Sequence, residues 1–216
     1  MEYKPGNKPD KVKHKALENL VDLILPSTYV EFHSGPGRYN GYDGSSVRTL
    51  NILKGRGIDS TVYLHEKDDG LRQQLIANTL GFKSDKQEIF VGGEWENSQE
   101  NYLNADHSWL FLLDPTKIKS YNKYSINFLD KTLSTGANFL LYMPQGLFKS
   151  KQQQKARRGH RKKVKEIKDL IGKYQRNYLD RFIFAGRGNL KRKDHIVIVS
   201  ELIPDLKACF KKYISN

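Results

Sequence analysis

The chain has little cysteine, no long apolar run and few acidic residues for its number of basic ones. Its one cysteine, Cys209, excludes an internal disulfide and a multi-cysteine zinc site, and this usage is typical of a reducing compartment. The longest apolar stretches, such as Trp109–Leu113, are far shorter than the ~20 residues of a membrane helix, and no basic-then-apolar leader starts the chain. We therefore expect a cytoplasmic protein with no membrane partner.

The shortage of acids leaves a large positive charge. Thirty-seven Lys and Arg residues stand against 24 Asp and Glu, which gives a net charge of +13. Residues 149–168 hold ten of the cations and one acid, Glu166, so this segment carries +9 of the total. Such a concentration favours a polyanionic partner. With 216 residues, 38% of them hydrophobic, the chain is otherwise expected to form a single domain over residues 1–216.

Short apolar runs alternate with segments of helical period, a pattern that predicts an α/β sheet with crossover helices. Strands are expected at residues 29–32, 61–65, 89–91, 109–113, 138–142, 182–184 and 195–199. Helices are expected around residues 17–24, 50–53, 71–76, 126–133, 160–178 and 206–213. Pro26 is expected to stop the first helix and Gly81 the third, with Leu71, Leu75 and Ile76 facing inward.

A glycine-rich bend follows the first expected strand. In the segment VEFHSGPGRYNG, residues 30–41, it consists of Gly35, Pro36 and Gly37. Glycines at this point let backbone N–H groups approach a ligand closely, as in nucleotide-binding folds. Asn40 stands where the dinucleotide fingerprint has its third glycine, which disfavours a nicotinamide dehydrogenase. The alternative is an ordinary turn without a ligand.

Two acids follow other expected strands. Glu66 ends the second one, where an acid beside a glycine-rich loop accepts both hydroxyls of a ribose. The alternative is that Glu66 is one charge in the exposed run 66–69. Asp114 and Pro115 end the run 109–113, where a carboxylate is placed to accept hydrogen bonds from a ligand or an amine. The alternative for this pair is an ordinary helix entry.

The order of these features resembles the bacterial family of 23S ribosomal RNA adenine-N6 methyltransferases. The similar segments are GNKPDKVKH (6–14), HSGPGRY (33–39), YDGSS (42–46), LHEKD (64–68) and LLDPTKIKSY (112–121). They run in the family's order over about two thirds of the chain, and the first is the most specific because nucleotide folds in general do not need it. The loop at residues 33–39 is also similar to that of the three-cysteine-motif partner proteins.

The resemblance implies a Rossmann-like class I methyltransferase fold, a mostly parallel α/β sheet of about seven strands with an antiparallel last strand. It also implies S-adenosylmethionine as the cofactor, no metal, and methyl transfer to RNA at adenine N6. Asp114 and Pro115 are the implied catalytic residues, with Asp114 accepting hydrogen bonds from the target amino group. The implied cofactor-binding residues are Lys13, His14, His33, Ser34, Gly35, Gly37, Ser45, Glu66, Glu94 and Trp95.

The sequence departs from this family at two places. Tyr39 and Ser45 are only six residues apart, so the family's small inserted subdomain is missing. Thr116 and Lys117 replace the second proline and the aromatic residue of its Asp-Pro-Pro-Tyr motif. The aromatic ring stacks on a flipped base, an interaction worth ~1–3 kcal/mol that a lysine does not make. The second hypothesis is therefore a catalytically silent methyltransferase-fold protein that binds nucleic acid or a protein partner.

The basic segment, at about residues 148–178, is expected to be helical from about residue 160, with apolar residues at three-four spacing and a cationic outer face. We expect it to track the phosphate backbone of a nucleic acid, with an affinity that falls as salt rises. The resemblance alone implies RNA rather than DNA. The alternative is a solvated helix face. The residues assigned to this contact are Lys155, Arg157, Arg158, Arg161, Lys162, Lys163 and Lys165.

Overall fold

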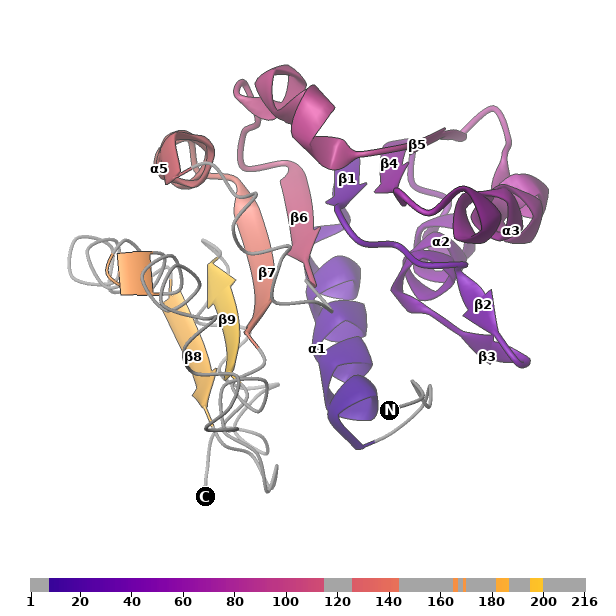
Figure 1. The fold of residues 1–216 in the computed structure, drawn as a ribbon, viewed down its shortest axis with the longest axis horizontal. Helices are drawn as coiled ribbons and strands as arrows, with labels where there is room; N and C mark the ends of the chain where they lie inside the picture. The colour runs from indigo at the N-terminus through magenta and orange to yellow at the C-terminus, as the bar shows by residue number, and fades with distance from the viewer. Residues whose placement is uncertain are drawn as a thin grey trace. The chain divides into compact units, whose positions relative to one another are not determined.

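A computed structural model describes residues 8–114, 126–143, 165–166, 169, 182–186 and 195–199 of the protein (Figure 1). The chain divides into two compact units. The first comprises residues 1–95 and 108–113, and the second comprises residues 96–107 and 114–216. Within the residues described, no helix has the length and apolar character needed to cross a bilayer.

The first unit is built on parallel strands. In spatial order they are β5 (Gln87–Gly92), β4 (Ser60–His65), β1 (Thr28–Glu31) and β6 (Trp109–Leu113). β1 is central, with Val30 opposite Tyr63 of β4 and Phe111 of β6. All of its residues are buried, as expected for a parallel strand covered on both faces. The chain passes from β1 to β4 and β5 on one side and then returns to β6 on the other side of β1. The carboxyl end of β1 is therefore the point where such sheets bind ligands.

Three helices accompany this sheet: α1 (Lys8–Ile24), α2 (Ser45–Arg56) and α3 (Asp69–Thr79). α1 ends before Pro26 as predicted, because the preceding Leu25 takes a left-handed φ of 47° instead of continuing the helix. α1 packs against α2, and it buries Leu17, Leu20 and Val21. α2 stops at Gly57, whose φ of 66° lets its N–H bond to the last helical carbonyls.

The end of α3 differs from the prediction. The helix ends at Thr79 and passes into a 3₁₀ turn, η1 (Leu80–Phe82), so Gly81 lies inside that turn and does not cap the helix. Leu75 is buried, but Ile76 is 39% exposed, so its expected inward orientation was wrong. Four residues after Leu75, Thr79 takes the next buried position and donates its hydroxyl to the Leu75 carbonyl at 2.8 Å. The buried stripe therefore continues through a threonine, which the apolar pattern does not show.

A hairpin that the sequence pattern did not reveal follows the glycine-rich loop. β2 (Arg38–Tyr39) pairs antiparallel with β3 (Tyr42–Asp43). Asn40 and Gly41 join them with left-handed φ angles of 47° and 78°, as a type I′ turn requires. The hairpin contacts α2 through β3 and α3 through β2 (Figure 1). It stands at the place in the sequence where the resembled family has its inserted subdomain.

The second unit contains α5 (Ile126–Ser134), β7 (Asn138–Met143), β8 (Phe182–Gly186) and β9 (His195–Val199), as well as most of the 3₁₀ helix η2 (Trp95–Tyr102). β9 lies between β7 and β8 and runs antiparallel to both, which confirms the predicted antiparallel last strand. α5 buries Phe128, Leu129 and Leu133, so the helix predicted around residues 126–133 is confirmed. The helix expected at 206–213 lies outside the described residues; of the one at 160–178, Lys165, Glu166 and Asp169 are described and helical.

Candidate functional site

The loop after β1 contacts the acid that follows β4. The N–H of Gly35 donates to Oε2 of Glu66 at 3.0 Å, and the N–H of Ser34 donates to the carbonyl of His65 at 3.0 Å. The other carboxylate oxygen of Glu66, Oε1, accepts the N–H of Asp68 at 2.9 Å. The Glu66 carboxylate is thus fixed by backbone donors from both sides. Each oxygen keeps a further lone pair that can accept a hydroxyl.

Glycine is required at two points of this loop for different reasons. Gly35 has a left-handed φ of 60°, and a Cβ built there meets nothing within 4 Å, so the space beside the loop is open at this residue. A Cβ on Gly44 would lie 2.9 Å from the carbonyl oxygen of Gly37, which accepts the N–H of Gly44 at 2.7 Å. The loop and the start of α2 are therefore joined through backbone that approaches too closely for a side chain.

A buried carboxylate that the sequence analysis did not single out ends β1. Glu31 is 0% exposed, accepts the hydroxyl of Tyr29 at 3.0 Å and accepts a short hydrogen bond from the hydroxyl of Ser45, the first residue of α2. The first turn of α2 contains no acidic residue of its own, so the positive end of the helix dipole is available to this carboxylate. The signal that could have revealed Glu31 is a single acid in the apolar strand directly before the glycine-rich loop.

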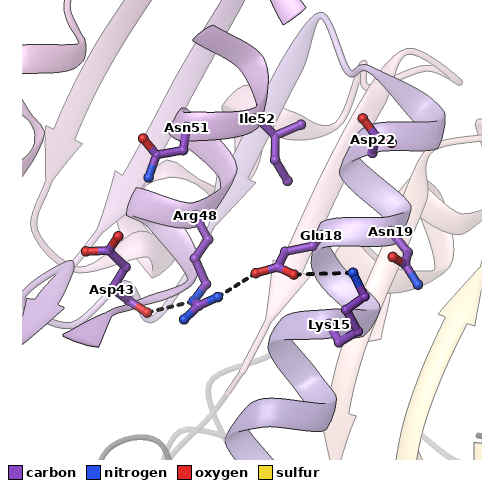
Figure 2. A pocket seen from close by; sticks show the side chains of 8 residues that line it. All are labelled: Lys15, Glu18, Asn19, Asp22, Asp43, Arg48, Asn51 and Ile52. Atoms are coloured by element: carbon purple, nitrogen blue, oxygen red, sulfur yellow. Dashed lines mark hydrogen bonds and ion pairs between the residues drawn. The ribbon is translucent and has the colours of Figure 1, made fainter. Parts of the chain in front are cut away.

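α1 reaches the same region through His14 and Glu18, which lie four residues apart on one helix face. The His14 ring stacks on Tyr42 of β3, with ring centroids 5.9 Å apart and planes inclined by 28°. Arg48 of α2 donates to Oε1 of Glu18 at 2.5 Å and to the carbonyl of Asp43 at 2.8 Å (Figure 2). Its guanidinium carbon lies 4.9 Å from the centroid of the Tyr42 ring. These contacts join α1, β3 and α2.

Beside these contacts the first unit has an open polar depression of about 380 Å³ (Figure 2). Charged groups in it are paired, Lys15 with Glu18 at 3.8 Å and Asp22 with Arg56 at 2.5 Å. Nowhere in the described chain do three His, Cys, Asp or Glu residues come together as possible metal ligands. The depression is lined by Lys15, Glu18, Asn19, Asp22, Asp43, Arg48, Asn51 and Ile52.

Glu94 and Trp95, the two implied cofactor-binding residues that follow β5, differ in burial. Trp95 is 3% exposed and stacks on Phe32 with ring centroids 4.5 Å apart, while Glu94 is exposed. His33, half-buried, meets the Trp95 ring edge-on at 6.4 Å. Trp95 therefore packs against the residue that follows β1 and forms part of the core at that end of the strand.

The remaining predicted site residues are placed as follows. Lys13 is buried on α1, and Asp114 is buried directly after β6, in the second unit. Lys165 is helical and exposed. The first unit brings Ser34, Gly35, Gly37, Ser45 and Glu66 together at the carboxyl ends of β1 and β4. Outside the described residues lie Pro115, Lys155, Arg157, Arg158, Arg161, Lys162 and Lys163.

No protein-family model and no curated protein matches this sequence. Solved structures are similar in fold. A Legionella pneumophila protein of the family DUF519 matches with a TM-score of 0.60 at 14% identity, over 98% of this chain and 94% of that one. An O-methyltransferase from Bacillus cereus, crystallised with SAH, matches with a TM-score of 0.56 at 12% identity, over 92% and 83%. A candidate rRNA methylase from Clostridium thermocellum matches with a TM-score of 0.53 at 10% identity, over 93% and 99%. The chain therefore has an α/β Rossmann-like methyltransferase fold.

Proposed function

We propose that the protein is an S-adenosylmethionine-dependent methyltransferase that acts on nucleic acid. The observation that carries this proposal is the hydrogen bond from the N–H of Gly35 to the carboxylate of Glu66. It joins the glycine-rich loop after β1 to the acid after β4, the two elements that hold a nucleoside-type cofactor in sheets of this topology. The fold shared with the O-methyltransferase crystallised with SAH supports the choice of cofactor.

The residues present fit such a cofactor. The space beside Gly35 is open, and Glu66 keeps acceptor capacity for the two hydroxyls of a ribose. S-adenosylmethionine, when bound, supplies a methyl group activated by a positively charged sulfur. The backbone of the loop and the carboxylate of Glu66 would bind and orient it, and the buried Glu31 lies at the end of β1 beside the loop.

Asp114 is the proposed catalytic residue. It follows the last residue of β6, the strand next to β1, and is 6% exposed. In this role its carboxylate accepts hydrogen bonds from the target amino group and turns the nitrogen lone pair toward the methyl donor. Such a transfer depends on alignment and on exclusion of water more than on a strong base.

The nucleic-acid substrate is proposed from charge. Residues 149–168 carry a net charge of +9, and Lys165 within them is helical and exposed. A phosphate backbone is the partner whose chemistry matches such a segment. RNA and the adenine N6 position are the finer proposal, and they follow from the motif resemblance described above.

The proposal is tested by methyl transfer from isotope-labelled S-adenosylmethionine to total cellular RNA. We expect transfer by the wild-type protein, loss of transfer in Asp114→Ala, and retained binding of S-adenosylhomocysteine in that variant. Asp85→Ala removes an exposed acid and serves as the matched control. Transfer that is unchanged in Asp114→Ala would remove Asp114 from the mechanism.

A catalytically silent protein on the same fold is the second candidate. It is favoured by Lys117, which stands where the resembled family has the aromatic residue that stacks on the target base. Binding of S-adenosylhomocysteine without transfer to RNA, protein or small-molecule fractions would support this candidate over the first.

A further inference from the structure

We infer that Arg48 is a positioning residue that sets the affinity for the cofactor through its contacts with Glu18, Tyr42 and Asp43. The inference rests on the proposed function, because it concerns binding of the methyl donor. Arg48 belongs to α2 and lies outside every motif that pointed to the site. In this role it holds α1 and the hairpin in place beside the glycine-rich loop.

Arg48 makes directed contacts with two other elements. Its Nη1 group donates to Oε1 of Glu18 in α1 at 2.5 Å, and its Nε–H donates to the carbonyl of Asp43 in β3 at 2.8 Å. The guanidinium carbon also lies 4.9 Å from the centroid of the Tyr42 ring, within the range of a cation–π interaction. A guanidinium is planar and carries its donors in a fixed geometry, so these contacts fix both position and direction.

The partners of Arg48 are adjacent to the candidate site. Asp43 precedes Gly44, whose N–H donates to the carbonyl of Gly37 in the loop at 2.7 Å. Ser45 comes next and donates its hydroxyl to the buried Glu31 at the end of β1. A displacement of the Asp43 carbonyl is therefore passed along the backbone to the two contacts that close the loop onto α2.

The α1 side of the link works through one helix face. His14 and Glu18 are four residues apart, and they contact Tyr42 and Arg48 respectively. Arg48 and Tyr42 also touch each other, so the contacts form a closed set across α1, β3 and α2. If Arg48 is removed, the stack of His14 on Tyr42 is the contact of this set that still joins α1 to the hairpin. Small misplacements of binding groups are costly, so the affinity is expected to fall.

The chain supplies a matched control. Arg56 of α2 pairs with Asp22 of α1 at 2.5 Å, so it is a second ion pair between the same two helices. The side chains of Arg56 and Asp22 are 56% and 46% exposed, whereas those of Arg48 and Glu18 are 26% and 25% exposed. Arg56 lies about two helical turns after Arg48 in α2. Loss of this pair removes a link between α1 and α2 and leaves the hairpin contacts in place.

The test compares Arg48→Gln, Arg48→Lys and Arg56→Gln in the full chain, with calorimetric titration of S-adenosylhomocysteine and a thermal melt for each. We expect Arg48→Gln to raise the Kd about tenfold, Arg48→Lys to restore part of the loss, and Arg56→Gln to leave the Kd within about twofold. An unchanged Kd in Arg48→Gln would overturn the inference. An equal rise of the Kd in Arg56→Gln would also overturn it, because the loss of any ion pair between α1 and α2 would then explain the effect.

A second pair of variants covers the case in which Arg48→Gln does not fold. Tyr42→Leu removes the ring that both His14 and Arg48 contact, and Tyr42→Phe keeps it. We expect a weakened Kd in Tyr42→Leu that Tyr42→Phe rescues, and equal binding by the two variants contradicts the inference. Failure of the folded wild-type protein to bind S-adenosylhomocysteine overturns the proposed function and the inference with it, whereas wild-type binding with an unchanged Arg48 variant overturns the inference alone.

Discussion

The carboxylate of Glu31 accepts a hydrogen bond from the hydroxyl of Ser45, which ties the end of β1 to the first residue of α2. The glycine-rich loop and the hairpin lie between these two residues in the sequence. Because Glu31 is 0% exposed, its carboxyl oxygens need hydrogen-bond partners within the protein, and Tyr29 supplies another at 3.0 Å. The link closes the segment that carries most of the candidate site.

Removal of the Glu31 carboxylate should destabilise the fold more than removal of one of its donors. Tyr29→Phe deletes one hydrogen bond and is expected to cost ~1 kcal/mol. Glu31→Ala removes both of these hydrogen bonds, from Tyr29 and from Ser45, and opens a cavity, so we expect a loss of ~3 kcal/mol or more in the free energy of unfolding. Urea unfolding of both variants measures the difference. Equal losses would contradict the assigned role of Glu31.

Alanine substitution should change the stability of the protein in opposite directions at Gly44, which directly precedes α2, and at Gly55, which lies within α2. At Gly44 a Cβ meets the Gly37 carbonyl oxygen at 2.9 Å, so Gly44→Ala is expected to lower the free energy of unfolding by ~1–3 kcal/mol. At Gly55, within the helix, a Cβ meets nothing within 4 Å, and Gly55→Ala is expected to raise stability by ~0.5–1 kcal/mol. Denaturant midpoints of the two variants measure this, and a stable Gly44→Ala protein would show that the loop can move away from α2.

The acid after β4 should matter for the ligand more than for the fold. Glu66→Gln keeps a carbonyl acceptor but loses the charge, and hydrogen bonds to charged groups contribute ~1.5–3 kcal/mol, so we expect the Kd for S-adenosylhomocysteine to rise about 10- to 100-fold. Glu88→Gln, at an exposed position on the neighbouring strand β5, is the control. If Glu66→Gln binds as tightly as Glu88→Gln, the ribose contact is located elsewhere.

The basic segment should govern the salt dependence of nucleic-acid binding. Charge reversal at Arg157, Arg158, Arg161 and Lys162 is expected to abolish most RNA affinity, because these cations are assigned to phosphate contacts. The slope of log K against log salt is expected to become shallower by ~0.7 for each lost contact to a single strand. Fluorescence anisotropy with labelled RNA measures both. The exposed Lys67, Lys83, Lys86 and Lys131, reversed together, are a control of equal charge change, and equal effects of the two sets would mean that only net charge matters.

The strands of the sheet, unlike β2 and β3 of the hairpin, could be predicted because each contains a short apolar run. The predicted ranges 109–113 and 195–199 agree residue for residue with β6 and β9. The position of Glu66 beside Gly35 also followed, since acids and loops at the carboxyl ends of neighbouring parallel strands meet at one edge. These predictions depend only on local pattern and on sheet topology.

Other features depend on contacts that no local pattern carries. Glu31 was overlooked because a buried acid is recognised by its donors, and Ser45 is 14 residues away. Arg48 was overlooked because its partners come from α1 and β3, and its role exists only once those elements pack together. The hairpin was missed although Asn40 and Gly41 form a strong turn signal, because its strands are only two residues long.

The most direct test of the proposed function is calorimetric titration of the folded wild-type protein with S-adenosylhomocysteine, the demethylated product of the cofactor. We expect saturable binding of one ligand per chain and a rise in the melting temperature with ligand concentration. Absence of both heat and thermal stabilisation, in a protein shown to be folded by circular dichroism, would contradict the assignment of a cofactor site to the loop between Glu31 and Ser45.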